Sequence, residues 1–336
     1  MAPNQRSGGS GEDQLIARYF RPLAKHPGAL GLTDDAAVIT PPPGCDLVLK
    51  TDGVISGVHF FPDDPAALVA KKVLRMNLSD LAAKGATPLG FLLAIALPRD
   101  TAETWLAAFA QGLGEDAEHY GCPLLGGDTD RTPGPLSVSV TAFGSVPEGT
   151  MVLRSRAKPG DVVVVTGTIG DAALGLRLRR DRAAADRWNL SADLRHHLLD
   201  RYLLPQPRNV IAASIRAFAS AAMDVSDGLA GDLAKLCRAS RASADIDSAR
   251  VPLSGAARTA LAAEPTLMEA ILTGGDDYEI IATVPPDRLQ ALETAAAGTG
   301  VAVSEIGRMR AGEGEATFLG ADGNPLAFAQ PSFSHF

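Results

Sequence analysis

The pattern of apolar and polar positions predicts an N-terminal half in which strands and helices alternate. Three segments are typical of strands because they are short, apolar or alternating, and bounded by turn residues or proline. They are residues 47–51, 91–97 and 136–143, and Asp52 stands at the exit of the first.

Two longer runs are typical of helices. Residues 65–84 form the first, which Asp64 can cap and for which Pro65 suits the first position. Asp100 with Glu103 predicts a capping box at the start of the second, which runs to about Tyr120. The N-terminal half is therefore expected to pack helices against a sheet.

The C-terminal half repeats the alternation. Its clearest strand is the continuous apolar run 162–165, which follows a turn at 158–161. Helices are expected over 171–182, 208–222 and 227–240, the last capped by Ser226, and strands are expected to end at Asp224 and to span 278–284. Strands that alternate with helices in both halves predict an α/β or α+β fold.

Length indicates two domains, because 336 residues exceed the usual size of one. We expect residues 1–11 to be a polar, disordered arm, residues 12–150 an N-terminal domain and residues 151–336 a C-terminal α/β domain. An apolar content of 46% supports a full core in both.

Composition excludes several classes of protein. Asp and Glu (39) outnumber Lys and Arg (31), which gives a net charge of −8 and no basic footprint for nucleic acid. No apolar run approaches the roughly 18 residues of a membrane-spanning helix, and residues 1–11 lack the apolar core of a signal peptide. Cys45, Cys122 and Cys237 lie far apart, which favours free thiols in a cytoplasmic protein.

Carboxylates at predicted strand ends and turns carry the chemical signal. Asp80 differs in sharing a helix face with Asn77 and Lys84. Converging carboxylates repel one another unless a cation neutralises them, and oxygen ligands suit Mg²⁺, which bridges carboxylates to phosphates. The acids next to apolar elements are Asp34, Asp35, Asp52, Asp80, Asp128, Asp224, Asp227, Asp276 and Asp277. Taken singly, each acid that stands beside a glycine or a second acid is explained as well by ordinary turn chemistry.

Known phosphate-binding motifs are missing from the sequence. It contains neither a P-loop nor the signature set of a protein kinase. Residues 167–171 after the valine-rich strand resemble a phosphate-binding turn that enters a helix, but the third glycine of a dinucleotide fingerprint is missing. A Rossmann NAD site is therefore disfavoured.

The ordered motifs resemble those of the thiamine-monophosphate kinase family, within the superfamily typified by aminoimidazole ribonucleotide synthetase. The matching stretches are Asp34-Asp35-Ala36-Ala37-Val38, residues 51–60, Asn77-Leu78-Ser79-Asp80-Leu81 through Ala86, Gly126-Gly127-Asp128-Thr129, residues 153–161, Met223 to Leu229 and Gly274 to Glu279. The resemblance implies ATP-dependent phosphorylation of thiamine monophosphate to thiamine diphosphate. It also implies a two-domain fold whose N-terminal sheet domains pair in a homodimer, with ATP near the interface.

The same resemblance assigns site residues by position. The family's Mg²⁺ ligands correspond to Asp35, Thr51, Asp52, Asp80, Asp128, Asp224 and Asp227. Its nucleotide positions correspond to Gly127, Asp128, Arg154 and Ser226, and its substrate positions to His59, Asp276 and Phe333. Asp52, Asp128 and Asp227 are the residues expected to support phosphoryl transfer. Without the family, His59 reads equally well as a hydrogen-bonded structural histidine and Phe333 as a packing residue.

This sequence departs from the family pattern at four positions. Thr33 replaces a usual Gly, Lys50 stands where a small hydroxyl residue often helps hold a metal, Ala110 replaces an aromatic and Asp276 replaces Glu. These departures leave the phosphoryl-transfer class intact, and Lys50 and Asp276 are the only support for a non-catalytic protein. Two alternatives stay open. One is a sister ATP-dependent synthetase with another acceptor, and the other is a non-catalytic nucleotide-binding relative.

Overall fold

A computed structural model describes residues 11–330 and residue 332. The expected N-terminal arm lies outside these residues except for Gly11, which begins α1 (Gly11–Leu15). The chain divides into two compact units. The first takes residues up to Pro43, Leu49–Asn77 and Pro88–Ser145, and the second takes Gly44–Val48, Leu78–Thr87 and the chain from Val146 onward.

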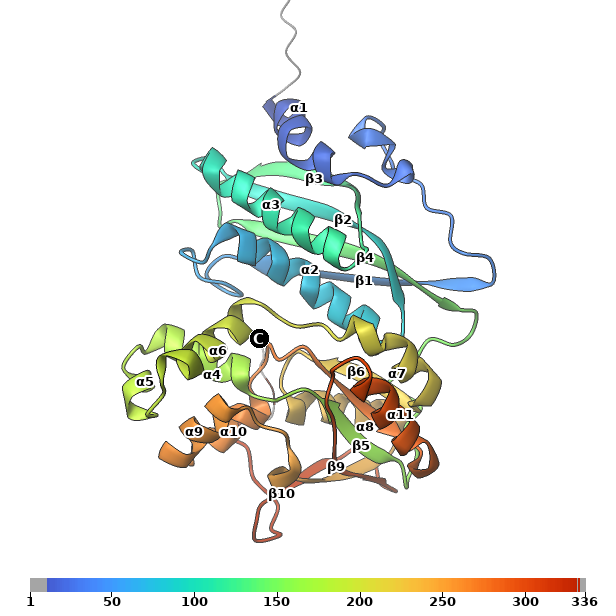
Figure 1. The fold of residues 1–336 in the computed structure, drawn as a ribbon, viewed down its shortest axis with the longest axis vertical. Coiled ribbons are helices and arrows are strands. Elements are labelled where there is room, and N and C mark those ends of the chain that lie inside the picture. The colour runs from blue at the N-terminus through green and yellow to red at the C-terminus, as the bar shows by residue number, and fades with distance from the viewer. Residues whose placement is uncertain (1–10, 331, 333–336) are drawn as a thin grey trace, which may run out of the picture. The chain divides into compact units, whose positions relative to one another are not determined.

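The first unit is built on a four-stranded sheet with helices on one face (Figure 1). Its strands are β1 (Cys45–Ile55), β2 (Thr87–Pro98), β3 (Leu124–Thr132) and β4 (Ser137–Pro147), in the order β1-β4-β2-β3 with β2 and β3 parallel. The helices are α2 (Ala66–Ala83) and α3 (Glu103–His119). A short π-helix, η1 (Ile16–Phe20), and the short 3-10 helices η2 (Arg21–Leu23) and η3 (Pro27–Leu32) precede the sheet.

An apolar core packs the helices against the sheet, and a buried ion pair joins the two helices. Val73 and Leu74 of α2 are fully buried, as is Phe91 of β2. Between the helices, Nε of Arg75 lies 2.5 Å from Oδ2 of Asp116, and both side chains are buried. Because a buried charge is costly without a partner, this pair fixes α2 against α3.

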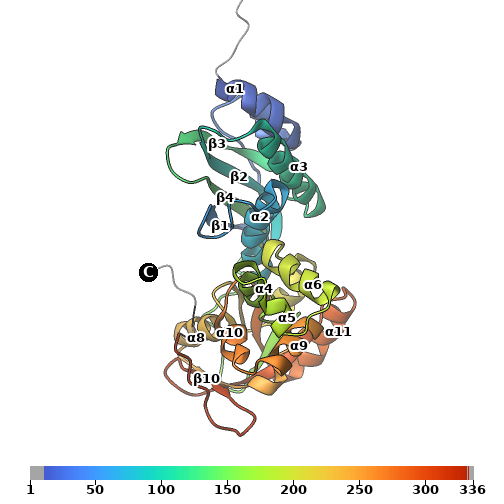
Figure 2. The ribbon, with the colours of Figure 1, turned by 90° about the vertical axis from the view of Figure 1, so that its left-hand side faces the viewer.

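The second unit is built on a six-stranded sheet with helices around it (Figure 2). Its strands are β5 (Val162–Thr166), β6 (Ala221–Val225), β7 (Ser243–Asp247), β8 (Glu279–Val284), β9 (Val303–Arg310) and β10 (Ala316–Leu319), in the order β10-β7-β9-β5-β8-β6. Only the β10–β7 pairing among these is parallel. The α-helices are α4 (Asp171–Arg180), α5 (Ala184–Arg187), α6 (Ala192–Leu203), α7 (Ala212–Phe218), α8 (Leu229–Ser240), α9 (Gly255–Ala263), α10 (Leu267–Thr273) and α11 (Leu289–Ala297). Short 3-10 helices are η4 (Asn209–Ile211), η5 (Ser248–Arg250) and η6 (Pro286–Arg288).

The two faces of β5 explain why residues 162–165 are all valine. Val163 and Val165 belong to the core that includes Leu174, whereas Val162 and Val164 belong to a second core that includes Ile215. Successive side chains on a strand point to opposite faces, so a sheet covered on both sides needs a continuous apolar run. The mixed α/β architecture predicted from the alternation is confirmed.

Several expected element boundaries are wrong. The first strand continues past residue 51 to Ile55, so Asp52 lies within β1 rather than after it. Likewise β3 continues through Asp128 to Thr132. The residues expected as one helix over 208–222 form η4 and α7, and β6 begins at Ala221. Polar residues at exposed sheet edges do not stop a strand, because the backbone pairs whatever the side chain.

Two expected helix caps do not form. The residue before α3 is Ala102, which has no side-chain cap, so Asp100 does not make the predicted capping box. Helix α8 begins after Gly228, and the backbone N–H groups of Ser226 and Asp227 both donate to Oδ2 of Asp232 at 2.9 Å. The carboxylate that satisfies this turn therefore comes from inside the helix. No helix among the described residues is both long and apolar enough for a bilayer.

Candidate active site

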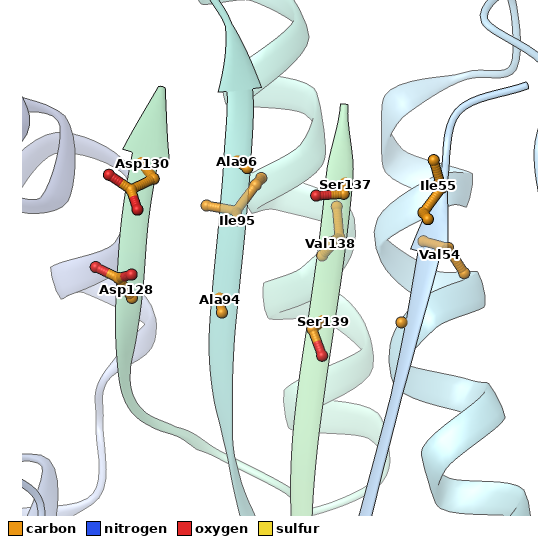
Figure 3. A pocket seen from close by; sticks show the side chains of 11 residues that line it. Val54, Ile55, Ala94, Ile95, Ala96, Asp128, Asp130, Ser137, Val138 and Ser139 are labelled. Atoms are coloured by element: carbon orange, nitrogen blue, oxygen red, sulfur yellow. The ribbon is translucent and has the colours of Figure 1, made fainter. Parts of the chain in front are cut away.

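A pocket of about 390 Å³ lies on the face of the first sheet opposite α2 and α3 (Figure 3). Asp128 and Asp130 of β3 line it, and the small residue Ala94 of β2 contributes to its floor. Ser137 and Ser139 of β4 add hydroxyl groups. Because Asp128 and Asp130 are two residues apart on one strand, their carboxylates share a face. The pocket therefore offers oxygen donors on an otherwise apolar surface.

Gly127 lets β3 approach β2 beside this pocket. A Cβ at position 127 would lie 1.8 Å from the carbonyl oxygen of Leu93. Any side chain there would push the two strands apart, so glycine is required on steric grounds. Asp128 follows at once, and its Oδ1 accepts the N–H of Thr129 at 3.0 Å. The backbone at Gly127 and this hydrogen bond thus fix the position of the Asp128 carboxylate.

Strand β1 lies at the other edge of the sheet from β3. The hydroxyl of Thr51 donates to the carbonyl of Val140 at 3.2 Å, whereas the next side chain, Asp52, points to the opposite face. Oδ2 of Asp52 lies 3.0 Å from Nζ of Lys50. Two strands separate Asp52 from Asp128, so the sheet of one chain does not bring these two acids together.

The remaining predicted residues of the first unit lie outside the pocket lining. Nδ1 of His59 accepts the N–H of Ile55 at 3.0 Å and so closes the turn after β1. That contact needs the tautomer with the proton on Nε2. Asp35 is exposed in a segment without regular structure, and its N–H donates to Oδ1 of Asp34. His59 thus has the structural contact that its alternative interpretation requires.

In the second unit, predicted residues gather at the turn between β6 and α8. Asp224 is buried near the end of β6, and Ser226 and Asp227 follow it. Nζ of Lys235 lies 2.5 Å from Oδ2 of Asp227 and 2.8 Å from Oδ1 of Asp232. Burial raises the pKa of Asp232, which Lys235 opposes. Burial lowers the pKa of Lys235, but its two carboxylate contacts outweigh that effect and leave it raised.

Asp80 and Arg154 lie elsewhere in the second unit. Asp80 is half-buried near the end of α2, and one turn later Nζ of Lys84 donates to the carbonyl of Ala222 at 2.7 Å. Arg154 is exposed, and its carbonyl accepts the hydroxyl of Ser240 at 2.8 Å. The guanidinium of Arg154 is thus placed where a phosphate from solvent can reach it.

Asp276 lies in the loop between α10 and β8 with a positive φ of 74°. Its N–H donates to the carbonyl of Ser226 at 2.9 Å, which docks the loop on the turn that holds Asp227. The hydroxyl of Tyr278 donates to Oδ1 of Asp276 at 3.2 Å. Phe333, the other predicted substrate residue besides His59, lies outside the described residues.

The donor chemistry fits Mg²⁺ held jointly with phosphate. No three described Asp, Glu, His or Cys side chains come close enough together to enclose a metal ion. Mg²⁺ is usually bound by one or two carboxylates, several waters and the oxygens of a substrate phosphate. The pair Asp128 and Asp130, and the acids Asp224 and Asp227, supply ligands of that kind.

Sequence reasoning missed some of the polar residues at these places. Asp130 could have been found, because it stands two residues after Asp128 in a strand and must share its face. Ser137 and Ser139 carry the same period-two signal. Asp232 and Lys235 look like ordinary exposed positions of an amphipathic helix, and nothing in the sequence pattern marks them as partners of the preceding turn.

Comparison with known proteins identifies the class. Residues 33–146 match the family "AIR synthase related protein, N-terminal domain", and residues 158–320 match "AIR synthase related protein, C-terminal domain". A thiamine-monophosphate kinase of Caulobacter vibrioides is 44% identical over 92% of this chain and 87% of its own length. The chain belongs to the AIR synthase related family and, within it, to the thiamine-monophosphate kinases.

Two solved structures share this fold over most of their length. The thiamine-monophosphate kinase from Stenotrophomonas maltophilia has a TM-score of 0.81 and 39% identity, covering 94% of this chain and 96% of its own. A structure described as "AaThiL complexed with AMPPCP and TMP" has a TM-score of 0.76 and 29% identity, covering 90% of this chain and 91% of its own. The expected resemblance and the two-domain fold are confirmed.

Proposed function

We propose that this protein is an ATP-dependent kinase that converts thiamine monophosphate to thiamine diphosphate. The observation that carries the proposal is its similarity, over nearly the whole chain, to thiamine-monophosphate kinases. One solved relative is complexed with AMPPCP, an ATP analogue, and with TMP, which supports ATP as co-substrate and thiamine monophosphate as acceptor. This similarity favours the kinase over the two alternatives, a sister synthetase and a non-catalytic relative.

The reaction is a direct phosphoryl transfer. An oxygen of the thiamine monophosphate phosphate attacks the γ-phosphorus of ATP, the bond from that phosphorus to the β–γ bridging oxygen breaks, and ADP leaves. Because the attacking oxygen is already an anion near neutral pH, the chain needs no general base. The work left to the protein is positioning and neutralisation of charge.

The acids have the role of holding Mg²⁺, which when bound supplies positive charge to the transferring phosphoryl group. In this proposal Asp35, Thr51, Asp52, Asp80, Asp128, Asp224 and Asp227 are its ligands. The open pocket beside Asp128 and the partly exposed carboxylate of Asp227 support this assignment, because each combines carboxylate oxygens with access from solvent.

Other residues bind the two substrates. Gly127 lets the backbone beside Asp128 lie close to the pocket, Arg154 pairs with phosphate charge, and Ser226 offers a hydroxyl beside Asp227. His59, Asp276 and Phe333 border the thiamine moiety. Asp276 suits this role chemically, because the thiazolium ring of thiamine is a cation that a carboxylate attracts.

We further propose that residues 12–150 bind ATP and pair in a homodimer, that residues 151–336 form the C-terminal domain, and that the enzyme works in the cytoplasm. The pairing is supported by the sheet face opposite the helices, where Leu49 is 62% exposed and Ile55 39% exposed. Apolar side chains on such a face are stabilised when a second copy covers them.

The proposal is tested by incubating the protein with ATP, Mg²⁺ and thiamine monophosphate and separating the thiamine species by chromatography. Thiamine diphosphate that forms with Mg²⁺ and not with EDTA supports the kinase. Release of ADP without thiamine diphosphate would assign the chain to a sister enzyme with another acceptor. Binding of ATP with no turnover of any phosphorylated acceptor would identify the non-catalytic relative.

A further inference from the structure

The loop Gly274–Tyr278 is held in a backbone conformation that its side chains do not favour. Asp276 has a φ of 74° and Tyr278 a φ of 51°, both in the left-handed region. Non-glycine residues persist there only when their surroundings hold them. Space is also tight, since a Cβ at Gly275 would lie 2.4 Å from the carbonyl oxygen of Ser226. Some feature of the fold must therefore hold this loop.

Asp277, which lies between the two strained residues, is that feature. Its Oδ1 and Oδ2 accept the N–H of Gly170 at 3.0 Å and 2.9 Å. Gly170 is the residue before α4, and the N–H of Ala172 also contributes to the environment of the Asp277 carboxyl group. The turn at 167–171, which the sequence marks as a phosphate-binding candidate, is thus occupied by a carboxyl group of the chain itself.

The main chain on either side of Asp277 is bound to the other flank of the site. The N–H of Asp276 donates to Ser226 at 2.9 Å, and the N–H of Tyr278 donates to Val225 at 2.8 Å. The loop is therefore fixed at two places. The side chain of Asp277 ties it to α4, and its backbone ties it to the turn that carries Asp227.

The other buried acids near Asp277 are committed to different contacts. Asp171 accepts hydrogen bonds from Thr168 at 2.7 Å and from Ser254 at 2.5 Å, and it contacts His197 at 2.9 Å. Glu279 pairs with Arg208 and accepts the hydroxyl of Thr166. The described contacts of Asp171 go to its own turn, to α6 and to the residue that caps α9, whereas the contacts of Asp277 fix the loop.

We infer that Asp277 is a positioning residue: its carboxyl group holds the Gly274–Tyr278 loop against α4 and so sets where Asp276 meets the acceptor substrate. This inference rests on the proposed function, in which Asp276 borders the thiamine moiety. It predicts that loss of Asp277 weakens binding of thiamine monophosphate without an equal effect on ATP, because the contacts of Asp277 are to the Asp276 loop and α4.

The test compares Asp277→Ala with Asp171→Ala, a matched loss of a buried carboxyl group beside the same helix end. Asp277→Ala should raise the KM for thiamine monophosphate about tenfold or more, with the KM for ATP and kcat within about threefold. Asp171→Ala should lower thermal stability but keep the KM for thiamine monophosphate within about twofold. Asp277→Asn retains one acceptor oxygen for Gly170 and should recover most of the affinity.

Hydrogen exchange supplies a readout that does not depend on turnover. The amides of Asp276 and Tyr278 should exchange faster in Asp277→Ala than in Asp171→Ala. If Asp277→Ala does not fold, Asp277→Asn is measured in its place, with smaller changes of the same sign. Equal exchange and equal KM values in the matched variants would overturn the inference. A wild-type protein that makes no thiamine diphosphate would instead overturn the proposed function, and exchange alone would then decide whether Asp277 holds the loop.

Discussion

On β1, the ammonium nitrogen of Lys50 lies 3.0 Å from Oδ2 of Asp52. The two residues are two positions apart on one strand, so their side chains share a face. The carboxylate that the account assigns to Mg²⁺ thus already has a cation of the chain beside it. Both side chains are partly exposed, so the pair contributes little to folding, about 1 kcal/mol or less. The main effect of the Lys50–Asp52 pair is expected on the affinity of Asp52 for a metal ion.

Replacing Asp52 by Asn should reduce turnover much more than stability. The substitution removes the negative charge that we propose holds Mg²⁺ near the transferring phosphoryl group, and loss of one such electrostatic contact lowers kcat by about 100-fold or more. The unfolding free energy should change by about 1 kcal/mol or less, because the contact with Lys50 is exposed. Steady-state kinetics and chemical denaturation measure the two effects. Near-normal turnover would show that Asp52 is not part of the site.

Replacing Lys50 by Ser should tighten binding of a divalent cation. Without the ammonium group, the Asp52 carboxylate loses its internal counter-charge and regains full attraction for a metal ion. Titration of the protein with Mn²⁺ in the presence of an ATP analogue, followed by electron paramagnetic resonance, gives affinity and stoichiometry without turnover. Lys25→Ser removes another surface ion pair, with Glu118, and serves as the control. Equal Mn²⁺ binding in wild type and Lys50→Ser would contradict the role given to Lys50.

The buried carboxyl of Asp277 should make stability depend on pH. Burial, and then the nearby charges of Asp171 and Glu279, raise the pKa of Asp277 well above its ordinary value. The folded protein therefore keeps a proton that the unfolded chain releases above about pH 4. Stability should fall as pH rises from the unfolded pKa to the raised folded pKa, by at most about 1.4 kcal/mol per pH unit for this one group.

Asp277→Asn removes the titrating carboxyl group, so the pH dependence of stability can be compared between wild type and variant. Denaturant unfolding of wild type and variant at several pH values should show a smaller fall with pH in the variant. Parallel profiles would mean that Asp277 titrates in the folded protein as it does in the unfolded chain.

Replacing Arg75 by Met should destabilise the first unit strongly. Asp116 would then be buried without its partner, and breaking a buried pair in this way costs about 3–5 kcal/mol. The double variant Arg75→Met/Asp116→Leu should recover most of the loss, because it removes both charges. Thermal and denaturant unfolding test this. Full stability of the single variant would show that solvent reaches Asp116.

The elements and the family could be predicted from the sequence, whereas the contacts that shape the site could not. A continuous apolar run identifies β5, because both faces of its sheet are covered. The cap residue and proline before α2 identify that helix. The contacts of Asp232 and Asp277 cannot be predicted, since their partners, the backbone N–H groups of Ser226 and Gly170, have no signature in sequence. Only the tertiary structure shows which backbone groups these carboxyl groups bind.

The boundary errors have the same origin. Asp52 and Asp128 were expected after their strands because aspartate beside glycine usually marks a turn. In the structure both lie within strands at the two edges of one sheet, where a polar side chain has access to solvent. The sequence pattern therefore identifies candidate site acids, but it does not predict on which strand positions and faces of the sheet they lie.

The most direct test of the account follows the fate of the γ-phosphate. The protein is mixed with γ-³²P-labelled ATP, Mg²⁺ and thiamine monophosphate, quenched at short times, and separated into nucleotides, thiamine species and protein. Direct transfer predicts label in thiamine diphosphate, one equivalent for each ADP formed, and none bound covalently to the protein. Label that accumulates in inorganic phosphate or on the protein, with no labelled thiamine diphosphate, would contradict direct transfer to thiamine monophosphate.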